Sequence, residues 1–168
     1  MSFEKIQLFL ETNPEYGWVL VFFFGFMESM IITGSFMPSA VLFSLCIYLY
    51  NIELLTLPWI CGIALLGSHL GDVCGFLVGK SIGPRLLSSK FMQKRQKPIN
   101  KTQEFLERFG PYTVLVGRFI PAIRPLVPFL LGITDLRLKR FYVADVIACT
   151  LWAIALALLV VSVGSIFK

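Results

Sequence analysis

One segment, residues 117–132 (GRFIPAIRPLVPFLLG), restricts the fold more than any other part of the sequence. It is mostly apolar, yet it carries two arginines and three prolines. A helix that faces lipid excludes both, because a charge at the bilayer centre costs about 3 kcal/mol or more and a proline removes a backbone hydrogen bond. Broken backbone at membrane depth is tolerated only where it is buried in protein or lines a wet cavity. We therefore expect residues 111–134 to form an inner, bent element.

The composition of the whole chain is that of an integral membrane protein. Of its 168 residues, 57% are hydrophobic and 15% are charged, whereas soluble domains carry about 25% charged residues. The mean hydropathy is +0.78, and the length accommodates one membrane domain. The four cysteines are scattered through apolar runs, so we interpret them as small buried side chains. A single histidine excludes a multi-histidine metal centre, and we expect no metal ion and no other cofactor.

Charge divides the chain into two apolar blocks, residues 17–80 and 111–168, and a polar linker, residues 81–110. Cations dominate from the end of the first block through the linker, where only two glutamates oppose them: Lys80, Arg85, Lys90, Lys94, Arg95, Lys97, Lys101 and Arg108. Cytoplasmic loops are enriched in Lys and Arg, so the linker is predicted to be cytoplasmic. Residues 1–16 lack the basic start of a signal peptide, and they predict a short amphipathic helix at the membrane interface.

The flanking charges also predict how the second block enters the membrane. Segment 111–134 lies between the basic linker and the cations of residues 137–140, so both of its ends are expected on the cytoplasmic side. A segment that enters and leaves on the same side is a re-entrant hairpin, and the three prolines are expected to mark its turn. Residues 139–166 then cross the membrane once, because about 20 apolar residues are enough to span it.

The first block repeats this pattern with acidic flanks. It breaks at residues 33–38, no Lys or Arg occurs between Lys5 and Lys80, and residues 55–80 run inward to the linker. A hairpin followed by a span therefore occurs twice in opposite orientations, which is the inverted repeat found in many transporters. The predicted fold is an all-α membrane protein of two inverted repeats, each a re-entrant helical hairpin plus a transmembrane helix.

Five ionisable residues are predicted at membrane depth or near it: Glu28, Asp72, Arg118, Arg124 and Asp145. Charges inside a membrane are costly and by default indicate a functional site. Two arginines on the arms of one hairpin can converge on an anion, and guanidinium groups suit phosphate geometry. We therefore expect Arg118 and Arg124 to bind the phosphate of a lipid whose tail stays in the bilayer. Glu28, supported by Asp72, is the expected proton-responsive partner, because burial favours the neutral form of a carboxyl group and a nearby arginine favours the charged form.

Structural interpretations of the same residues stand as alternatives. The arginines can instead cap the broken helix ends and pair with Glu28 and Asp72. Asp145 is interpreted as structural, and His69, one turn before Asp72, as a satisfied interfacial histidine rather than a proton relay. Glycines recur every four residues across residues 67–83. This spacing lets a helix pack closely against a neighbour, and it leaves a homodimer as an alternative.

Three stretches of the sequence resemble the DedA family of membrane proteins, also called the VTT family. The strongest is FGPYTVLVGRFIPAIRPLVPFLLGI, similar to the family signature G-R-F-x-P-x-x-R-x-x-x-P-x-x-A-G, and GSHLGDVCGFLVGKSIG and FYVADVIACTLWA resemble two further family stretches. The resemblance implies a bacterial inner-membrane lipid carrier, linked to flipping of undecaprenyl phosphate, to other phospholipid movement and to proton-dependent transport. It places the family's essential acidic residue on Glu28 and its two essential arginines on Arg118 and Arg124.

The chain departs from the family pattern within these regions. Many members have P-G-D at the turn of the first hairpin, where this chain has Pro38, Ser39 and Ala40 and so lacks a second carboxylate. Asp145 and Ala148 stand where the family has N and G near the end of the domain. A divergent branch that carries a different lipid is consistent with these departures.

Together these observations predict a membrane transporter rather than an enzyme, because no nucleophile or metal-ligand cluster accompanies the two arginines in the sequence. The expected cargo is a lipid with a phosphate headgroup, with undecaprenyl phosphate favoured, and protons are the expected coupling ion. No nucleic-acid partner is expected. The alternatives are a scramblase or flippase for another headgroup, a proton-coupled ion exchanger, an enzyme acting on lipid phosphates, and a structural scaffold.

Overall fold

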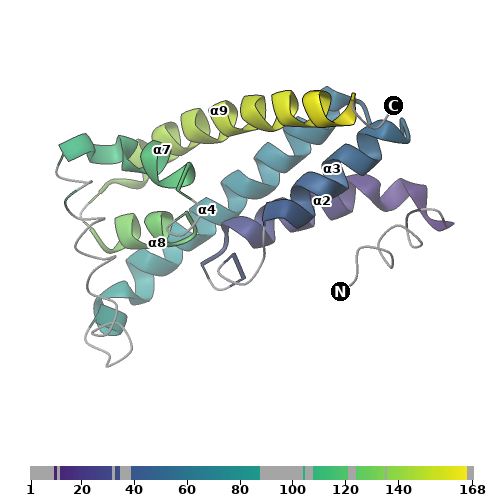
Figure 1. Ribbon diagram of the computed structural model, residues 1–168. Helices are drawn as coiled ribbons and strands as arrows, with labels where there is room; N and C mark the ends of the chain where they lie inside the picture. Colours follow the sequence, from purple (N-terminus) through teal and green to yellow (C-terminus); the bar gives the residue numbers. More distant parts are fainter. Residues whose placement is uncertain are drawn as a thin grey trace.

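Helices make up all the regular structure of the described residues in the computed structural model (Figure 1). The description covers residues 10, 12–31, 33–34, 39–87, 104, 108–120, 124–134 and 136–165, without the side chains of residues 84, 86 and 87. The prediction of an all-α protein is confirmed within these residues. The elements are η1 (Pro14–Tyr16), α2 (Gly17–Ser29), α3 (Ser39–Asn51), α4 (Leu57–Leu87), η2 (Gly110–Tyr112), α7 (Thr113–Arg118), α8 (Leu126–Ile133) and α9 (Leu138–Gly164).

Two helices in the described part of the chain are long and apolar enough to cross a membrane. The apolar stretches are Leu57–Gly83 of α4 and Leu138–Gly164 of α9, with 27 residues each. At 1.5 Å per residue each is about 40 Å long, which exceeds the hydrocarbon thickness of about 30 Å. The two spans predicted from the sequence are therefore present as helices. By contrast, α2 and α3 have 13 residues each and α8 has 8, so each is shorter than the bilayer core is thick.

The first break in the helical structure separates α2 from α3. Helix α2 ends where Met30 adopts extended backbone angles, φ −69° and ψ 137°. The Thr33 hydroxyl then donates to the carbonyl oxygen of Met27 at 2.5 Å, which satisfies one of the carbonyls that a helix end leaves without a partner. The break therefore begins at Met30, before the predicted start at residue 33.

The second break separates α7 from α8. Pro125 directly precedes α8 as its N-cap residue, as expected for a proline at the turn. Pro128 lies inside α8, in the first helical turn, where a proline is tolerated because the backbone N–H has no intrahelical acceptor. The interpretation of Pro128 as a turn residue is therefore wrong. Pro121 lies outside the described residues.

The glycines of residues 67–83 bring α4 into backbone contact with two other helices. A Cβ atom added at Gly71 would lie 2.7 Å from the carbonyl oxygen of Phe26 on α2, and one at Gly79 would lie 3.2 Å from Cα of Phe129 on α8. The prediction of close packing is thus confirmed. Because α2 and α8 of the same chain cover this stripe, it is not a free surface for a second copy.

The two halves of the chain make equivalent contacts. Helix α4 packs against α2 of its own half and α8 of the other half, and α9 packs against α7 of its own half and α3 of the other half. Exchanging α2, α3 and α4 for α7, α8 and α9 leaves this list of contacts unchanged. In Figure 1, α2 and α3 flank one half of the pair formed by α4 and α9, and α7 and α8 flank the other half.

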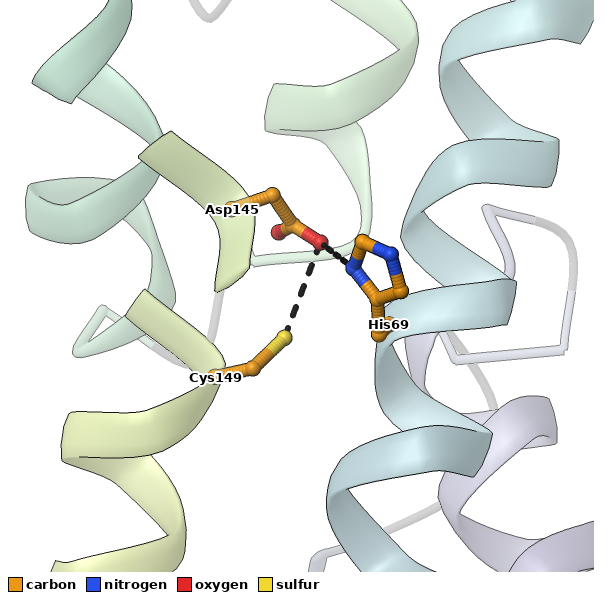
Figure 2. A group of neighbouring side chains, drawn as sticks. All are labelled: His69, Asp145 and Cys149. Carbon is orange, nitrogen blue, oxygen red and sulfur yellow. Dashed lines mark hydrogen bonds and ion pairs between the residues drawn. The ribbon is translucent and has the colours of Figure 1, made fainter. Parts of the chain in front are cut away.

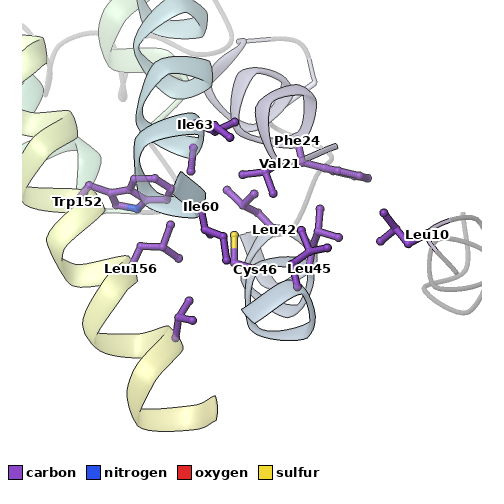
Figure 3. Packing of buried hydrophobic residues seen from close by; sticks show 13 residues of the cluster. Leu10, Val21, Phe24, Leu42, Leu45, Cys46, Ile60, Ile63, Trp152 and Leu156 are labelled. Atoms are coloured by element: carbon purple, nitrogen blue, oxygen red, sulfur yellow. The ribbon is translucent and has the colours of Figure 1, made fainter. Parts of the chain in front are cut away.

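Two apolar cores support this arrangement. The larger core lies among α2, α3, α4 and α9 (Figure 3) and contains 13 buried residues: Leu10, Val21, Phe24, Leu42, Leu45, Cys46, Leu49, Ile60, Ile63, Ala64, Trp152, Leu156 and Val160. The smaller core lies among α4, α7, α8 and α9, where the Phe76 and Phe141 rings stack with centroids 4.3 Å apart. Both cores contain buried residues of α4 and α9, so both hold the two long helices together.

Some predictions fall partly or wholly outside the described residues. Of the interfacial helix predicted for residues 1–16, only Leu10 and residues 12–16 are described, and there the structure has the 3-10 turn η1. Helix α4 continues to Leu87, so it takes in the first residues that the sequence assigned to the linker. Two cysteines, Cys46 and Cys149, are buried as predicted, whereas Cys61 and Cys74 are partly exposed.

Candidate functional site

Six ionisable side chains from five parts of the chain gather in the interior. Glu28 comes from the end of α2, His69 and Asp72 from the middle of α4, Arg118 from the end of α7, Arg124 from the turn before α8, and Asp145 from α9. None of the six is more than 7% exposed. All five residues predicted at membrane depth therefore meet in one cluster, and His69 joins them. We call these six residues the buried polar cluster.

Arg124 pairs with the first half of the chain. Its Nη1 donates to Oε1 of Glu28, and the hydroxyl of Ser39 donates to the same carboxylate oxygen. Ser39 is the first residue of α3, and Glu28 lies on α2. Glu28 therefore links α2 and α3 to the turn between α7 and α8, where Arg124 lies. Ser39 stands where many members of the resembled family have glycine before a second carboxylate, and here its hydroxyl supports Glu28.

Arg118 has two carboxylate partners. Its Nη1 donates to Oδ2 of Asp72 on α4 and lies 3.3 Å from Oδ1 of Asp145 on α9. A fully buried carboxylate is stable only when paired, so this guanidinium holds α7 against both long helices. Asp145 thus completes the charge pairing of Arg118, and its interpretation as structural stays a prediction.

Two further side chains contact the other oxygen of Asp145, Oδ2 (Figure 2). Nδ1 of His69 lies 2.6 Å from Oδ2, and the thiol of Cys149 donates to the same atom at 3.6 Å. The ring of His69 also meets the ring of Tyr142 edge to face, with centroids 4.6 Å apart. His69 is 7% exposed and faces the polar cluster. The prediction that its hydrogen bonding is satisfied is confirmed by the contact with Asp145.

The guanidinium groups of both arginines lie beside the ring of Trp152. Cζ of Arg124 lies 4.9 Å from the centroid of the Trp152 ring, and Cζ of Arg118 lies 5.8 Å from it. Both distances are within the range of a cation–π interaction. The ring is itself stacked on Phe43 of α3, with centroids 6.5 Å apart. Trp152 was not singled out from the sequence, although Asp145, Cys149 and Trp152 share one face of a helix at spacings of four and three.

In each arginine, one edge of the guanidinium group, formed by Nε and Nη2, has no hydrogen-bond partner among the described residues. Both use Nη1 for their carboxylate partners, and Nε and Nη2 of both are buried without a hydrogen-bond partner in the described part of the chain. Buried donors of this kind are rare in native proteins and call for an explanation. The Nε and Nη2 groups form one side of the planar guanidinium, which can donate two parallel hydrogen bonds to an oxyanion. The site is thus suited to an anion with several acceptor oxygens.

A cavity of about 250 Å³ lies beside the two arginines. Its polar lining consists of Arg118, Arg124 and Ser39, and the rest of its wall is apolar: Phe43, Phe119, Trp152, Ala155, Leu156 and Leu159. Ligand pockets usually measure roughly 300–1,000 Å³. This volume suits a headgroup rather than a whole lipid. Phe119 is 55% exposed, so the apolar wall continues onto the outer surface.

One group of side chains has the composition of a metal site. The ligand atoms of His69, Asp145 and Cys149 lie within 4.8 Å of one another. However, Arg118 lies against the same carboxylate, and its positive charge opposes a cation there. The geometry therefore favours a hydrogen-bonded group over a metal centre.

Comparison with known proteins gives one family and several relatives. Residues 37–162 match the VTT domain. The chain is 36% identical over 130 residues to an uncharacterized membrane protein of Buchnera aphidicola subsp. Schizaphis graminum, covering 76% of this chain and 51% of the relative. It is 30% identical over 149 residues to the inner membrane protein YabI of Escherichia coli K12, covering 88% and 58%. It is 28% identical over 152 residues to protein DedA of the same organism, covering 86% and 68%.

The chain spans just over half the length of the first of these relatives. No solved structure matches it.

Proposed function

We propose, since this chain belongs to the VTT-domain (DedA) family of membrane proteins, that it moves a phosphate-bearing lipid between the two leaflets of a membrane. The single observation that carries this proposal is the pair of free guanidinium edges on Arg118 and Arg124. Four buried N–H nitrogens around one tryptophan ring match the several acceptor oxygens of a phosphate monoester. The apolar wall of the adjacent cavity accommodates the first part of a lipid tail.

The path of the chain through the membrane is part of the proposal. Helices α4 and α9 cross the bilayer, and the pairs α2–α3 and α7–α8 enter and leave on one side as re-entrant hairpins. Helix lengths support this, because the paired helices in the described residues are shorter than the bilayer core. The exchange symmetry of the contacts supports an inverted repeat, with the basic linker of residues 81–110 on the cytoplasmic side of a bacterial inner membrane.

Substrate release follows from competition for the arginines. When Arg124 turns to the phosphate, it leaves Glu28 buried and without its cationic partner, and burial then favours the protonated carboxyl. When the phosphate leaves, Arg124 returns and Glu28 gives up the proton. Lipid movement is in this way coupled to protons, with Asp72 holding Arg118 in place.

Undecaprenyl phosphate is the lipid we favour, because its headgroup is a bare phosphate that fits a cavity of about 250 Å³ and its tail is entirely apolar. The reaction is transport and not chemistry on the phosphate. No nucleophile contacts the free guanidinium edges among the described residues, since the neighbouring cavity wall is aromatic and aliphatic apart from Ser39. Another phospholipid headgroup is the alternative cargo.

The test is movement of a fluorescent undecaprenyl phosphate analogue between leaflets of vesicles that contain the purified protein, with and without a pH gradient. Arg124→Ala is expected to reduce movement at least 100-fold while the protein stays folded. Arg140→Ala removes the same charge from an exposed position on α9 and is expected to have no effect. Normal movement in Arg124→Ala contradicts the proposal. Movement only of an ordinary phospholipid keeps the site and changes the cargo, and movement of no lipid favours an ion exchanger.

A further inference from the structure

The only histidine of the chain lies within the buried polar cluster. His69 comes from the middle of α4 and faces Asp145 on α9 across the helix interface (Figure 2), with Nδ1 2.6 Å from Oδ2. We propose that the pair of His69 and Asp145 is a proton-binding site of the transport cycle, which takes up one proton as the arginines bind phosphate and releases it as the phosphate leaves. This inference rests on the proposed function and adds a second proton site to Glu28.

The charges of the buried polar cluster support a second proton site beside Glu28. Three carboxylates (Glu28, Asp72 and Asp145) face two guanidinium groups in the cluster. With a neutral His69 the cluster carries a net charge of −1 from these groups, and a phosphate monoester would add −1 to −2. Buried charge without compensation is strongly unfavourable. A proton on Glu28 brings the charge of these groups to zero, but the phosphate still adds −1 to −2. A second proton, bound by His69, compensates one further negative charge.

Histidine is suited to supply this charge, because imidazole is the side chain whose charge ordinarily changes between pH 5 and 8. In the neutral ring, Nδ1–H donates to Oδ2 of Asp145 and Nε2 keeps a lone pair. A hydronium ion transfers a proton to Nε2: an O–H bond breaks as the N–H bond forms, a water molecule is left, and the imidazolium becomes an ion-pair partner of Asp145. The reverse step returns the same proton to water.

Protonation of His69 also weakens the electrostatic attraction between Asp145 and Arg118. Asp145 lies between them, with Oδ2 toward His69 and Oδ1 3.3 Å from the guanidinium. Once an imidazolium compensates Asp145, the carboxylate attracts Arg118 less strongly. Arg118 then keeps Asp72 as its partner and can turn its free edge to the phosphate. The proton and the phosphate therefore favour each other's binding, although they occupy different places.

The surroundings of His69 are negative on balance. From α9, Asp145 lies against the ring, as do the neutral side chains of Cys149 and Tyr142. On α4 itself Asp72 is one turn away, and from α7 Arg118 bonds both carboxylates. The remaining charges come from α2 and the turn before α8, namely Glu28 and Arg124, which compensate each other. Two carboxylates, Asp72 and Asp145, thus lie near the ring against one guanidinium group.

The number of protons bound with each phosphate tests the proposal directly. The full chain in detergent is titrated with a short-chain polyprenyl phosphate in buffers of different ionisation enthalpy, between pH 6 and pH 8. His69→Asn is the informative variant, because its amide nitrogen reaches the position of Nδ1 and can donate to Asp145 but cannot take a proton. Wild type is expected to take up about one proton more per phosphate than His69→Asn. The affinity of the variant is expected to depend less steeply on pH than that of wild type, by up to tenfold per pH unit for the one linked proton that is lost, and to keep the dependence that comes from Glu28.

A second measurement needs no variant. Because the chain has one histidine, the ¹⁵N spectrum of histidine-labelled protein without a purification tag reports this ring alone. Adding the polyprenyl phosphate near pH 7.5 is expected to convert the ring from the neutral to the imidazolium signature. A ring that stays neutral with phosphate bound overturns the inference, and so do equal proton counts in wild type and His69→Asn. If wild type does not bind the phosphate lipid at all, the proposed function fails and this inference fails with it.

Discussion

The two arginines differ in how firmly the protein holds them. Arg118 ends helix α7 and bonds two carboxylates from both long helices. Arg124 lies in the turn before α8 and bonds one carboxylate, which it shares with Ser39. Both leave the same edge free. Arg118 is therefore held as part of the framework, whereas Arg124 has fewer partners and is the arginine that exchanges its partner in the proposed transport cycle.

The largest expected effect is loss of the framework arginine. Arg118→Ala leaves two buried carboxylates, Asp72 and Asp145, without their guanidinium partner. Removal of one partner from a buried ion pair typically costs about 3–5 kcal/mol. Arg124→Ala removes the guanidinium partner of one carboxylate only, Glu28, which can take up a proton. Thermal unfolding of the purified proteins is therefore expected to show a clearly larger fall in Tm for Arg118→Ala. Equal falls for the two variants contradict the distinction between the arginines.

A steric substitution perturbs the helix that follows Arg124 without touching a charge. Gly79→Ala places a methyl group 3.2 Å from Cα of Phe129 on α8, and overpacking of this kind costs about 1–3 kcal/mol. Gly62→Ala is the matched control on the same helix, because nothing lies within 4 Å of its added Cβ. Thermal melting is expected to fall by several degrees for Gly79→Ala only. A fall of equal size in Gly62→Ala means that helix packing is not the cause.

Neutralising Glu28, the partner of Arg124, tests whether Arg124 exchanges this carboxylate for the phosphate. Glu28→Gln keeps an oxygen that accepts from Arg124 and Ser39 but removes one negative charge from the buried polar cluster. The affinity for a polyprenyl phosphate at pH 7 is expected to rise about tenfold, or about 1.4 kcal/mol, because Arg124 is no longer held by a charge. Transport by this variant is expected to slow and to lose its response to a pH gradient. Weaker binding than wild type contradicts the competition between Glu28 and phosphate.

The smallest effect is expected from the hydroxyl that supports Glu28. Ser39→Ala removes one hydrogen bond to a carboxylate, which contributes about 1–2 kcal/mol. A modest fall in Tm is expected, with transport reduced less than tenfold. Ser44→Ala is the control, because Ser44 lies on the exposed side of the same helix. Loss of transport as severe as in Arg124→Ala means that Ser39 itself binds the cargo.

Much of this arrangement could be predicted from the sequence. Two apolar blocks with internal breaks predicted the helix pairs and the two long helices, because apolar length and prolines act locally. The arginines of residues 117–132 predicted a convergent site, because charge inside the membrane requires partners. Pairing of the two arginines with Glu28 and Asp72 was predicted as the structural alternative, without assigning partners. The structure pairs Arg124 with Glu28 and Arg118 with Asp72.

The rest depended on which helix faces meet. His69 and Asp145 are 76 positions apart, and a single sequence does not state that these faces of α4 and α9 touch. The same limit hid the role of Trp152, which contacts both arginines. The prediction that Pro128 lies in the turn between the helices was wrong, because the first turn of a helix accepts a proline as well as a loop does.

The most direct measurement is a structure of the full chain with a bound polyprenyl phosphate. The account predicts that phosphate oxygens lie within about 3 Å of Nε and Nη2 of both Arg118 and Arg124, with the tail leaving along the apolar wall of the cavity. It further predicts that Glu28 has separated from Arg124 while Asp72 still contacts Arg118. A phosphate bound elsewhere, for instance at the exposed cations Lys139 and Arg140, with both arginines unchanged, would contradict the account.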